Sequence, residues 1–329
     1  MSESYLDVTD ELWRLDIDSL DWSLIEHDVI WPERRRCAGW VSTTEALLLW
    51  GGSGVESAGN GRLRHNFIDD LWSYEPVAER WNCIEPKLSS SRAQHSPPLR
   101  PPARYTPVMA AVPNRLYLYG GYTEDALGKR KMSDLWIREN SQWREVPAPP
   151  SKDYGSQGHW PADRYGCMTA QDDDGFYVCG GFSDDGDHID AWRFDFRDER
   201  WALLAPDQKG LDVPAPRYCA AMVRVPDGLV MFGGRSRIPP VSNFSDLWML
   251  EFASGRWRPI HGDSPHIYDG STERPGFHAK SGVARRDDHM YLWGGEGLHG
   301  HVSDLWRLDL RDFSWRCLQG QRDDDPVLW

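Results

Sequence analysis

Five short apolar runs, each closed by a pair of glycines, recur along the chain. The runs read LLLW, LYLY, FYVC, LVMF and MYLW. Short runs of apolar, β-branched and aromatic residues that end at glycine predict β-strands. A pattern that returns at similar intervals indicates a repeat architecture. The glycine pairs are Gly51-Gly52, Gly120-Gly121, Gly180-Gly181, Gly233-Gly234 and Gly294-Gly295.

Two tryptophans, at a regular distance from each other, follow each glycine pair. The first closes an acidic-x-Trp step, and the second comes nine residues later, or seven after Trp136. The same half-unit opens the protein at Glu11-Leu12-Trp13 and Trp22. The five steps begin at Asp70, Asp134, Asp190, Asp246 and Asp304, and the second tryptophans are Trp81, Trp143, Trp201, Trp257 and Trp315.

A basic residue precedes every glycine pair. The distance to the first glycine is fifteen residues in the first unit and sixteen in the other four. Each unit therefore predicts four strands, a to d: a starts at the basic residue, b ends at Gly-Gly, and c and d carry the tryptophans. The basic residues are Arg36, Arg104, Arg164, Arg217 and His278.

A four-stranded meander of this kind cannot bury both of its faces alone. Stacking such units around an axis buries them and leaves only short edges, with the tryptophans between units. The pattern resembles the kelch repeat family, and the resemblance covers about residues 10 to 318. It implies an all-β, kelch-type β-propeller, a fold that hosts both adaptors and enzymes.

The number of units leaves one blade incomplete. We expect a single domain over residues 1–329 with six blade positions, one of them reduced and completed by the termini or by a second chain. The alternative is five blades plus an extra hairpin. The half-unit spans 10–24, and the full units span about 33–84, 102–146, 162–204, 215–260 and 276–318.

Composition and net charge limit the classes of partner and the cellular location that we expect. The 329 residues carry a net charge of −14, which argues against nucleic acid or an anionic membrane as the main partner. Residues 1–8 have no apolar core and no apolar run is long enough to span a bilayer, so we expect a cytoplasmic protein. The six cysteines lack metal-ligand spacing and are expected to be reduced.

The long loops, which connect b to c and d to the next a, are predicted to share one face. Loops gathered on a rigid scaffold are where binding concentrates. The five basic residues at the starts of the a strands would lie at the channel mouth on that face, where arginine forks suit carboxylates. We therefore expect a binding module for an anionic peptide segment or a small carboxylate. The alternative role for these arginines is to tie loops together.

Histidines in the same loops complete the predicted ligand site. An enzyme acting on a small anionic metabolite, as an isomerase, lyase or cyclase with loop His or Asp as acid and base, is the alternative function. The spacing of the histidines identifies no metal site, and no cofactor is favoured. The histidines assigned to ligand binding are His65, His188, His299 and His301.

Overall fold

The computed structural model describes most of the chain as strands and turns. Among these residues there is no helix, and hence none that could cross a membrane. The all-β prediction is confirmed, while the cytoplasmic location stays a prediction. The described residues are 10–26, 28–57, 63–88, 99–125, 128–148, 159–207, 210, 212–238, 242–263, 273–298 and 300–320.

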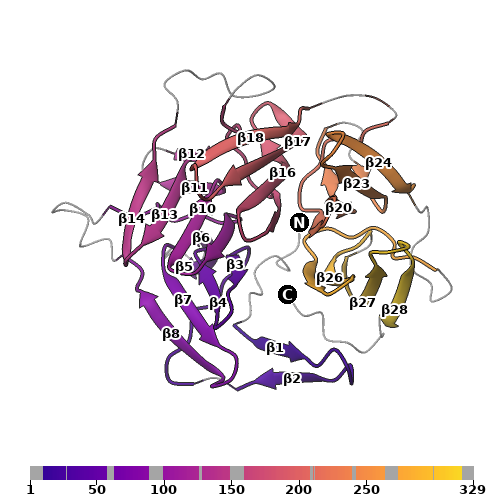
Figure 1. Cartoon of the computed structure of the whole chain (residues 1–329). Coiled ribbons are helices and arrows are strands. Elements are labelled where there is room, and N and C mark those ends of the chain that lie inside the picture. The colour runs from indigo at the N-terminus through magenta and orange to yellow at the C-terminus, as the bar shows by residue number, and fades with distance from the viewer. Residues whose placement is uncertain are drawn as a thin grey trace. The chain divides into compact units, whose positions relative to one another are not determined.

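The chain divides into two compact units. Unit 1 contains Met1–Ala148 with Asp163–Tyr165 and Trp329, and unit 2 contains Pro149–Ala162 and Gly166–Leu328. That all repeats share one domain stays a prediction. Among the described residues, the two units together hold five four-stranded antiparallel sheets, which are the blades (Figure 1).

Unit 1 holds two blades and three hairpins. In each blade the strands pair in chain order, as the unit pattern predicts. The β5–β6 and β11–β12 hairpins arise from the b–c loops. Blade 1 comprises β3 (Gly39–Ser42), β4 (Leu47–Trp50), β7 (Leu71–Glu75) and β8 (Arg80–Glu85); blade 2 comprises β9 (Val108–Val112), β10 (Arg115–Tyr119), β13 (Leu135–Glu139) and β14 (Gln142–Val146); the hairpins are β1 (Leu12–Leu15) with β2 (Trp22–Ile25), β5 (Ser53–Ser57) with β6 (Leu63–Phe67), and β11 (Tyr122–Asp125) with β12 (Gly128–Lys131).

Unit 2 holds three blades and one small hairpin. In blades 3 and 5 the b–c hairpin is continuous with the blade strands, so those strands are longer. Blade 3 comprises β15 (Met168–Gln171), β16 (Gly175–Ser183), β17 (Gly186–Asp195) and β18 (Arg200–Ala205); blade 4 comprises β19 (Ala221–Val225), β20 (Gly228–Phe232), β23 (Leu247–Glu251) and β24 (Arg256–His261), with hairpin β21 (Arg235–Ser236) and β22 (Ser242–Asn243); blade 5 comprises β25 (Gly282–Arg286), β26 (His289–Glu296), β27 (His301–Asp309) and β28 (Trp315–Gln319).

Alternation along the b strands places apolar side chains on both faces of a blade. In unit 2, Val230 and Phe232 belong to one buried cluster with Met290 and Leu292 of blade 5. Leu229 and Met231, on the opposite face of the same strand, belong to a cluster with blade 3. Successive residues of a strand point to opposite faces, so one b strand serves two inter-blade layers.

Glycine is required at these pairs because other segments of the same chain approach the backbone closely. Gly51 and Gly52 have φ of +64° and +98°, which favours glycine. A Cβ added to Gly51 would lie 2.7 Å from the carbonyl oxygen of Arg104. The N–H of Gly52 donates to that same carbonyl at 2.9 Å. The glycines thus fasten blade 1 to the start of blade 2.

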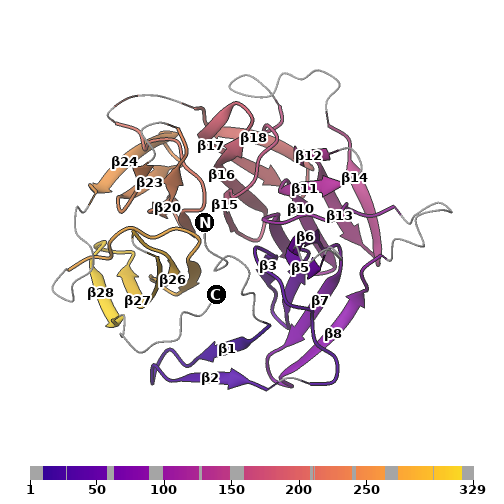
Figure 2. The same ribbon diagram turned by 180° about the vertical axis from the view of Figure 1, so that it is seen from behind.

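The N-terminal hairpin packs on blade 1 as a blade packs on its neighbour. Leu12 and Ile25 lie against a cluster that includes Leu49, Trp72 and Trp81. The β1–β2 hairpin lies beside blade 1 in both views (Figures 1 and 2). The described strands therefore correspond to the alternative form of the fold prediction, five blades and an additional hairpin.

Replacing Trp248 by Ala tests the inter-blade packing. Trp248 is buried in the layer between blades 3 and 4. We expect the free energy of unfolding to fall by about 3–5 kcal/mol, because the change leaves a large cavity. Chemical denaturation followed by far-UV circular dichroism measures it. Trp40→Ala is the control, because Trp40 is 47% exposed; equal losses for both variants would contradict the packing described.

Candidate functional site

The basic residue that starts each repeat binds the aspartate of the acidic-x-Trp step. In blade 2, the Nη1 and Nη2 of Arg104 donate to the two carboxylate oxygens of Asp134 at 2.6 and 2.8 Å. Nη1 also donates to the carbonyl of Gly120, and Nε to that of Pro102, both at 3.0 Å. The indole of Trp136 donates to the same aspartate at 2.6 Å. The three sequence markers are one hydrogen-bonded group.

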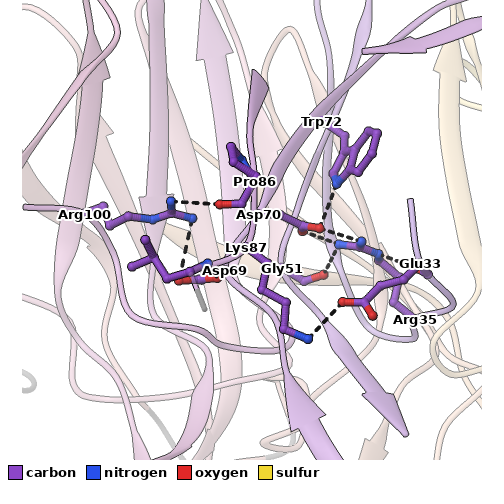
Figure 3. A network of polar contacts seen from close by, with 10 residues as sticks. Glu33, Arg35, Gly51, Asp69, Asp70, Trp72, Pro86, Lys87 and Arg100 are labelled. Carbon is purple, nitrogen blue, oxygen red and sulfur yellow. Dashed lines mark hydrogen bonds and ion pairs between the residues drawn. The ribbon is translucent and has the colours of Figure 1, made fainter. Parts of the chain in front are cut away.

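The same group recurs in other blades. Arg217 forms a bidentate pair with Asp246, and His278 Nε2 lies 2.9 Å from Asp304. In blade 1 the fork belongs to Arg35, whose Nη2 donates to Asp70 at 2.8 Å (Figure 3). The indoles at the first tryptophan of these blades also donate to the aspartates, at 2.6–2.7 Å.

The assignment of Arg36 to this position was wrong by one residue. The backbone of Arg36 forms a β-bridge with Ser53. This bridge is equivalent to the one between Tyr105 and Tyr122 in the next blade. Arg36 therefore matches Tyr105, and Arg35 matches Arg104. The sequence held the signal, because Arg35 stands sixteen residues before Gly51, the distance found in the other four units.

The predicted anion-binding forks are occupied by the protein itself. Arg104, Arg164 and Arg217 are fully buried, and His278 is 3% exposed. The guanidinium donors of Arg104 and Arg217 bind carboxylate and carbonyl oxygens within their own repeats. A direct role of these residues in ligand binding stays a prediction, and the contacts give them a structural role.

These pairs also shift the pKa values of two of the aspartates. Burial alone would raise the pKa of Asp134, but the charge and hydrogen bonds of Arg104 outweigh it and hold the pKa below the ordinary value. Burial likewise opposes ionisation of Asp304, and the hydrogen bond and charge of His278 lower its pKa overall. Both carboxylates are therefore stabilised as anions.

The structure describes the side chains of two of the four predicted histidines. His188 lies in β17, half-buried, with Nδ1 2.7 Å from Asp207 and Nε2 2.8 Å from the hydroxyl of Ser183. His301 begins β27 and is half-buried. His65 lies in β6, where only the backbone is described, and His299 lies outside the described residues.

One group of side chains in unit 2 has metal-ligand types within reach of one another. Ligand atoms of His188, Asp190 and Asp207 lie within 4.8 Å. Both ring nitrogens of His188 already have partners, and Asp207 accepts the backbone N–H groups of Ile189 and Asp190. Burial opposes ionisation of Asp207, yet hydrogen bonds from His188 and the backbone lower its pKa. Asp207 thus binds the backbone of β17 just before that strand begins to pair with β18.

Sequence reasoning missed an aromatic cluster in unit 1. Phe67, Tyr105, Tyr122 and Tyr165 have ring centroids 5.3–5.9 Å apart. Tyr105, Tyr122 and Phe67 are half-buried. Burial, followed by the neighbouring Tyr165, raises the pKa of Tyr105, so its hydroxyl stays protonated. The cluster is a partly exposed apolar surface bearing phenolic hydroxyls.

In unit 2, charged residues lie at or close to the repeat positions that Tyr105 and Tyr122 occupy in unit 1. Arg235 Nη1 lies 2.6 Å from Glu296, and Lys280 binds the same carboxylate. Burial opposes ionisation of Glu296, but the hydrogen bond and charge of Lys280 and the contacts of Arg235 lower its pKa. Arg237 donates from Nε to the hydroxyl of Tyr218 at 3.0 Å. We call Tyr218, Arg235, Arg237, Lys280 and Glu296 the cationic cluster.

The repeat explains the position of six of these residues. Tyr105, Tyr165 and Tyr218 directly follow the arginine that starts strand a, and Tyr122, Arg235 and Glu296 directly follow Gly-Gly. Backbone bridges join Tyr105 to Tyr122 and Tyr218 to Arg235. The repeat spacing, extended by one residue beyond each marker, points to these six positions, and Phe67, Arg237 and Lys280 lie outside it.

Comparison with known proteins agrees with these repeats. A family model described as the KLHDC2/KLHL20/DRC7 Kelch-repeats domain matches residues 87–266, which is 180 of the 329 residues. Bovine Kelch domain-containing protein 3 is 23% identical over 274 residues, covering 66% of this chain and 71% of that protein. Mouse Kelch domain-containing protein 1 is 22% identical over 311 residues, covering 86% and 68%.

The four-stranded blades with their Arg–Asp–Trp groups define a kelch-type β-propeller. The chain belongs to the kelch-repeat family. The family resemblance inferred from the glycine and tryptophan spacing is therefore confirmed.

Replacing Arg217 by Ala separates a structural from a ligand-binding role. The change leaves Asp246 buried without its cation, so we expect a loss of about 3–5 kcal/mol in the free energy of unfolding. Urea denaturation measures it. Arg256→Ala, which removes an exposed arginine, should change stability by less than about 0.5 kcal/mol. An Arg217→Ala protein as stable as the parent would exclude the structural role.

The lowered pKa values predict acid sensitivity. The unfolded chain takes up protons on Asp134 and Asp304 at a higher pH than the folded chain, so this stability is present above about pH 4 and is lost as the pH falls further. Asp134→Asn should lower the melting temperature at pH 7 and flatten its decline in acid. Melting curves from pH 7 to pH 3 measure both effects. An unchanged acid slope would contradict the assignment.

Proposed function

We propose that this protein is a peptide-binding module whose cationic cluster holds a carboxylate of an anionic peptide segment. The observation that carries the proposal is that Arg235 and Lys280 share the carboxylate of Glu296 while their side chains remain 31% and 39% exposed. An exposed guanidinium or ammonium group held in this way is suited to charge-assisted hydrogen bonds with a carboxylate from outside the chain.

The charge balance of the cluster favours an anion. Arg235 and Lys280 share the carboxylate of Glu296, so these three side chains carry a net charge of +1. The guanidinium of Arg237 lies over the rings of Phe182 and Tyr218, with its carbon 5.2 and 5.4 Å from their centroids. Stacking of this kind fixes the plane of the Arg237 guanidinium.

The exposure of the cluster favours access from solvent. The side chains of Arg235 and Lys280 are 31% and 39% exposed, in contrast to the fully buried Arg217. The backbone fixes their location, because the N–H of Lys280 donates to the carbonyl of Cys219 at 3.0 Å. A charged group that is held in place but remains accessible is suited to binding.

Unit 1 has a surface of its own that suits a protein partner. Aromatic residues on a protein surface provide contact area at low entropic cost and are enriched where proteins bind partners. The half-buried rings of Phe67, Tyr105 and Tyr122 offer such area.

The enzymatic alternative requires a titratable group that faces a ligand. His188, one of the histidines assigned to ligand binding, has Nδ1 2.7 Å from Asp207 and Nε2 2.8 Å from the hydroxyl of Ser183, so both ring nitrogens already have partners within unit 2.

Arg235→Ala tests the proposal directly. We expect the parent protein to bind fluorescein-labelled eight-residue peptides with Asp or Glu fixed at one position, and to bind matched Asn or Gln peptides more weakly. Fluorescence anisotropy measures the affinity. The variant should lose about ten- to a hundredfold, corresponding to one charge-assisted hydrogen bond of about 1.5–3 kcal/mol.

Arg311→Ala is the matched control, because Arg311 is an exposed arginine of the same unit paired with Asp309. It should retain the parent's affinity, and both variants should retain the parent's melting temperature. Equal binding of the acidic and amide peptides, or an equal loss in both variants, would refute the proposed carboxylate site.

A further inference from the structure

The cationic cluster continues into a loop that presents an exposed apolar side chain. Strand β21 ends at Ser236, and Arg237 and Ile238 follow it directly. Ile238 is large and apolar, and it is 43% exposed. Single exposed apolar residues are common on proteins, so the importance of this one depends on how firmly it is held and on what lies beside it.

A buried carboxylate of blade 3 holds this loop of blade 4. Asp187 of β17 is 7% exposed. Its Oδ2 accepts the hydroxyl of Ser236 and the backbone N–H of Arg237, both at 2.7 Å, and the N–H of Ile238 at 3.4 Å. The N–H of Ile238 also donates to the hydroxyl of Ser236 at 3.1 Å. Three consecutive residues of blade 4 are thus bound by one side chain of blade 3.

Side-chain packing holds the loop as well. Phe182 lies opposite Asp187 in the β16–β17 hairpin, and the guanidinium of Arg237 lies over its ring. A Cβ added to Gly186 would lie 3.5 Å from Cδ1 of Ile238, so this side chain packs close to the turn between β16 and β17. An exposed apolar group that is already fixed in place loses little conformational freedom on binding.

We propose that Ile238, positioned by Asp187, is a specificity-determining residue of the peptide site and contacts a large apolar side chain of the bound peptide. This role rests on the proposed binding of an acidic peptide segment at the cationic cluster. An apolar side chain next to the acidic one would cover Ile238, whereas a small carboxylate would leave it exposed.

The spacing along β21 limits the spacing in the peptide. Ile238 follows Arg235 by three residues, so their Cα atoms lie at most about 11 Å apart. An extended peptide advances by about 3.3 Å per residue, and this distance corresponds to about three residues. We therefore expect the apolar residue of the peptide within three positions of the acidic one.

A second copy of this chain is a poorer occupant of this surface. A symmetric contact between two copies would bring the same surface of each to the interface. Two cationic clusters would then face each other, and each carries a net positive charge on Arg235, Lys280 and Glu296. Like charges placed together in this way oppose association.

Peptides that differ in one apolar residue test the proposal. Fluorescein-labelled eight-residue peptides carry one Asp, a Leu one, two or three positions to either side, and Ser elsewhere. We expect the parent protein to bind the best of them at least about fivefold more tightly than the same peptide with Ala in place of Leu, because contact with Ile238 removes apolar surface from water. Fluorescence anisotropy measures both affinities.

Ile238→Ala shows whether this side chain causes the preference. The variant should bind the Leu and Ala peptides within about twofold of each other, and should still prefer Asp over Asn peptides. Ile84→Ala is the matched control, because Ile84 is 38% exposed and lies in unit 1. It should keep the parent's preference for Leu, and both variants should keep the parent's melting temperature.

Substitutions at Asp187 test the positioning. Asp187→Asn keeps an oxygen that accepts the donors of Ser236, Arg237 and Ile238, so it should keep the preference for Leu to within about twofold. Asp187→Ala removes these bonds and should abolish the preference. A merely structural role of Asp187 predicts a lower melting temperature for Asp187→Ala, with the preference for Leu unchanged in the folded protein.

The results that would overturn the proposal are distinct from those that refute the carboxylate site. Equal binding of the Leu and Ala peptides, or a preference that Ile238→Ala leaves unchanged, would refute the apolar contact even where Asp is preferred over Asn. Equal binding of Asp and Asn peptides would refute the carboxylate site, and with it the role of Ile238 beside that site. A dimeric mass by light scattering that becomes monomeric in Ile238→Ala would assign Ile238 to a contact between copies.

Discussion

The pairing of a buried basic side chain with the aspartate two residues before a tryptophan organises every level of this structure. In blade 2, Arg104 binds Asp134, the carbonyl of Gly120 and the carbonyl of Pro102 through its side chain. Its own carbonyl accepts the N–H of Gly52 from blade 1. One residue therefore connects strands a, b and c of its blade and fastens that blade to the preceding one.

A buried ion pair is favourable only when its remaining donors and acceptors are also satisfied, because desolvation of both charges is costly. The Arg104 group meets this condition, since carbonyl oxygens take the other guanidinium hydrogens and the Trp136 indole takes a lone pair of the carboxylate. His278 replaces arginine in blade 5 with fewer donors and binds only Asp304 and the carbonyl of Gly276. The same position accepts either side chain, because each bonds both to the aspartate and to a backbone carbonyl.

Most of the fold could be predicted because the constraints are local and repeated. A basic residue stands sixteen residues before Gly-Gly in all five units, and the two tryptophans of a unit lie nine or seven residues apart, so the strand order followed from these markers. The site could not be predicted equally well, because the sequence does not show whether an arginine faces solvent or an aspartate thirty residues away. Arg104 and Asp134 carry no mark of their pairing other than the repeat itself. Arg235, in contrast, was missed because it has no counterpart of the same type in other repeats.

The repeat also explains why chemically different residues lie one position beyond the structural ones. The basic residue and the glycine pair are fixed by buried hydrogen bonds, but the residues that follow them are only required to form a backbone bridge. Backbone bridges tolerate any side chain, and the equivalent positions hold Tyr105 in blade 2, Tyr218 in blade 4 and Ala279 in blade 5. The scaffold thus holds chemically different groups at matching places. The aromatic cluster in unit 1 and the cationic cluster in unit 2 both include residues from these bridge positions, where the fold fixes the backbone but not the type of side chain.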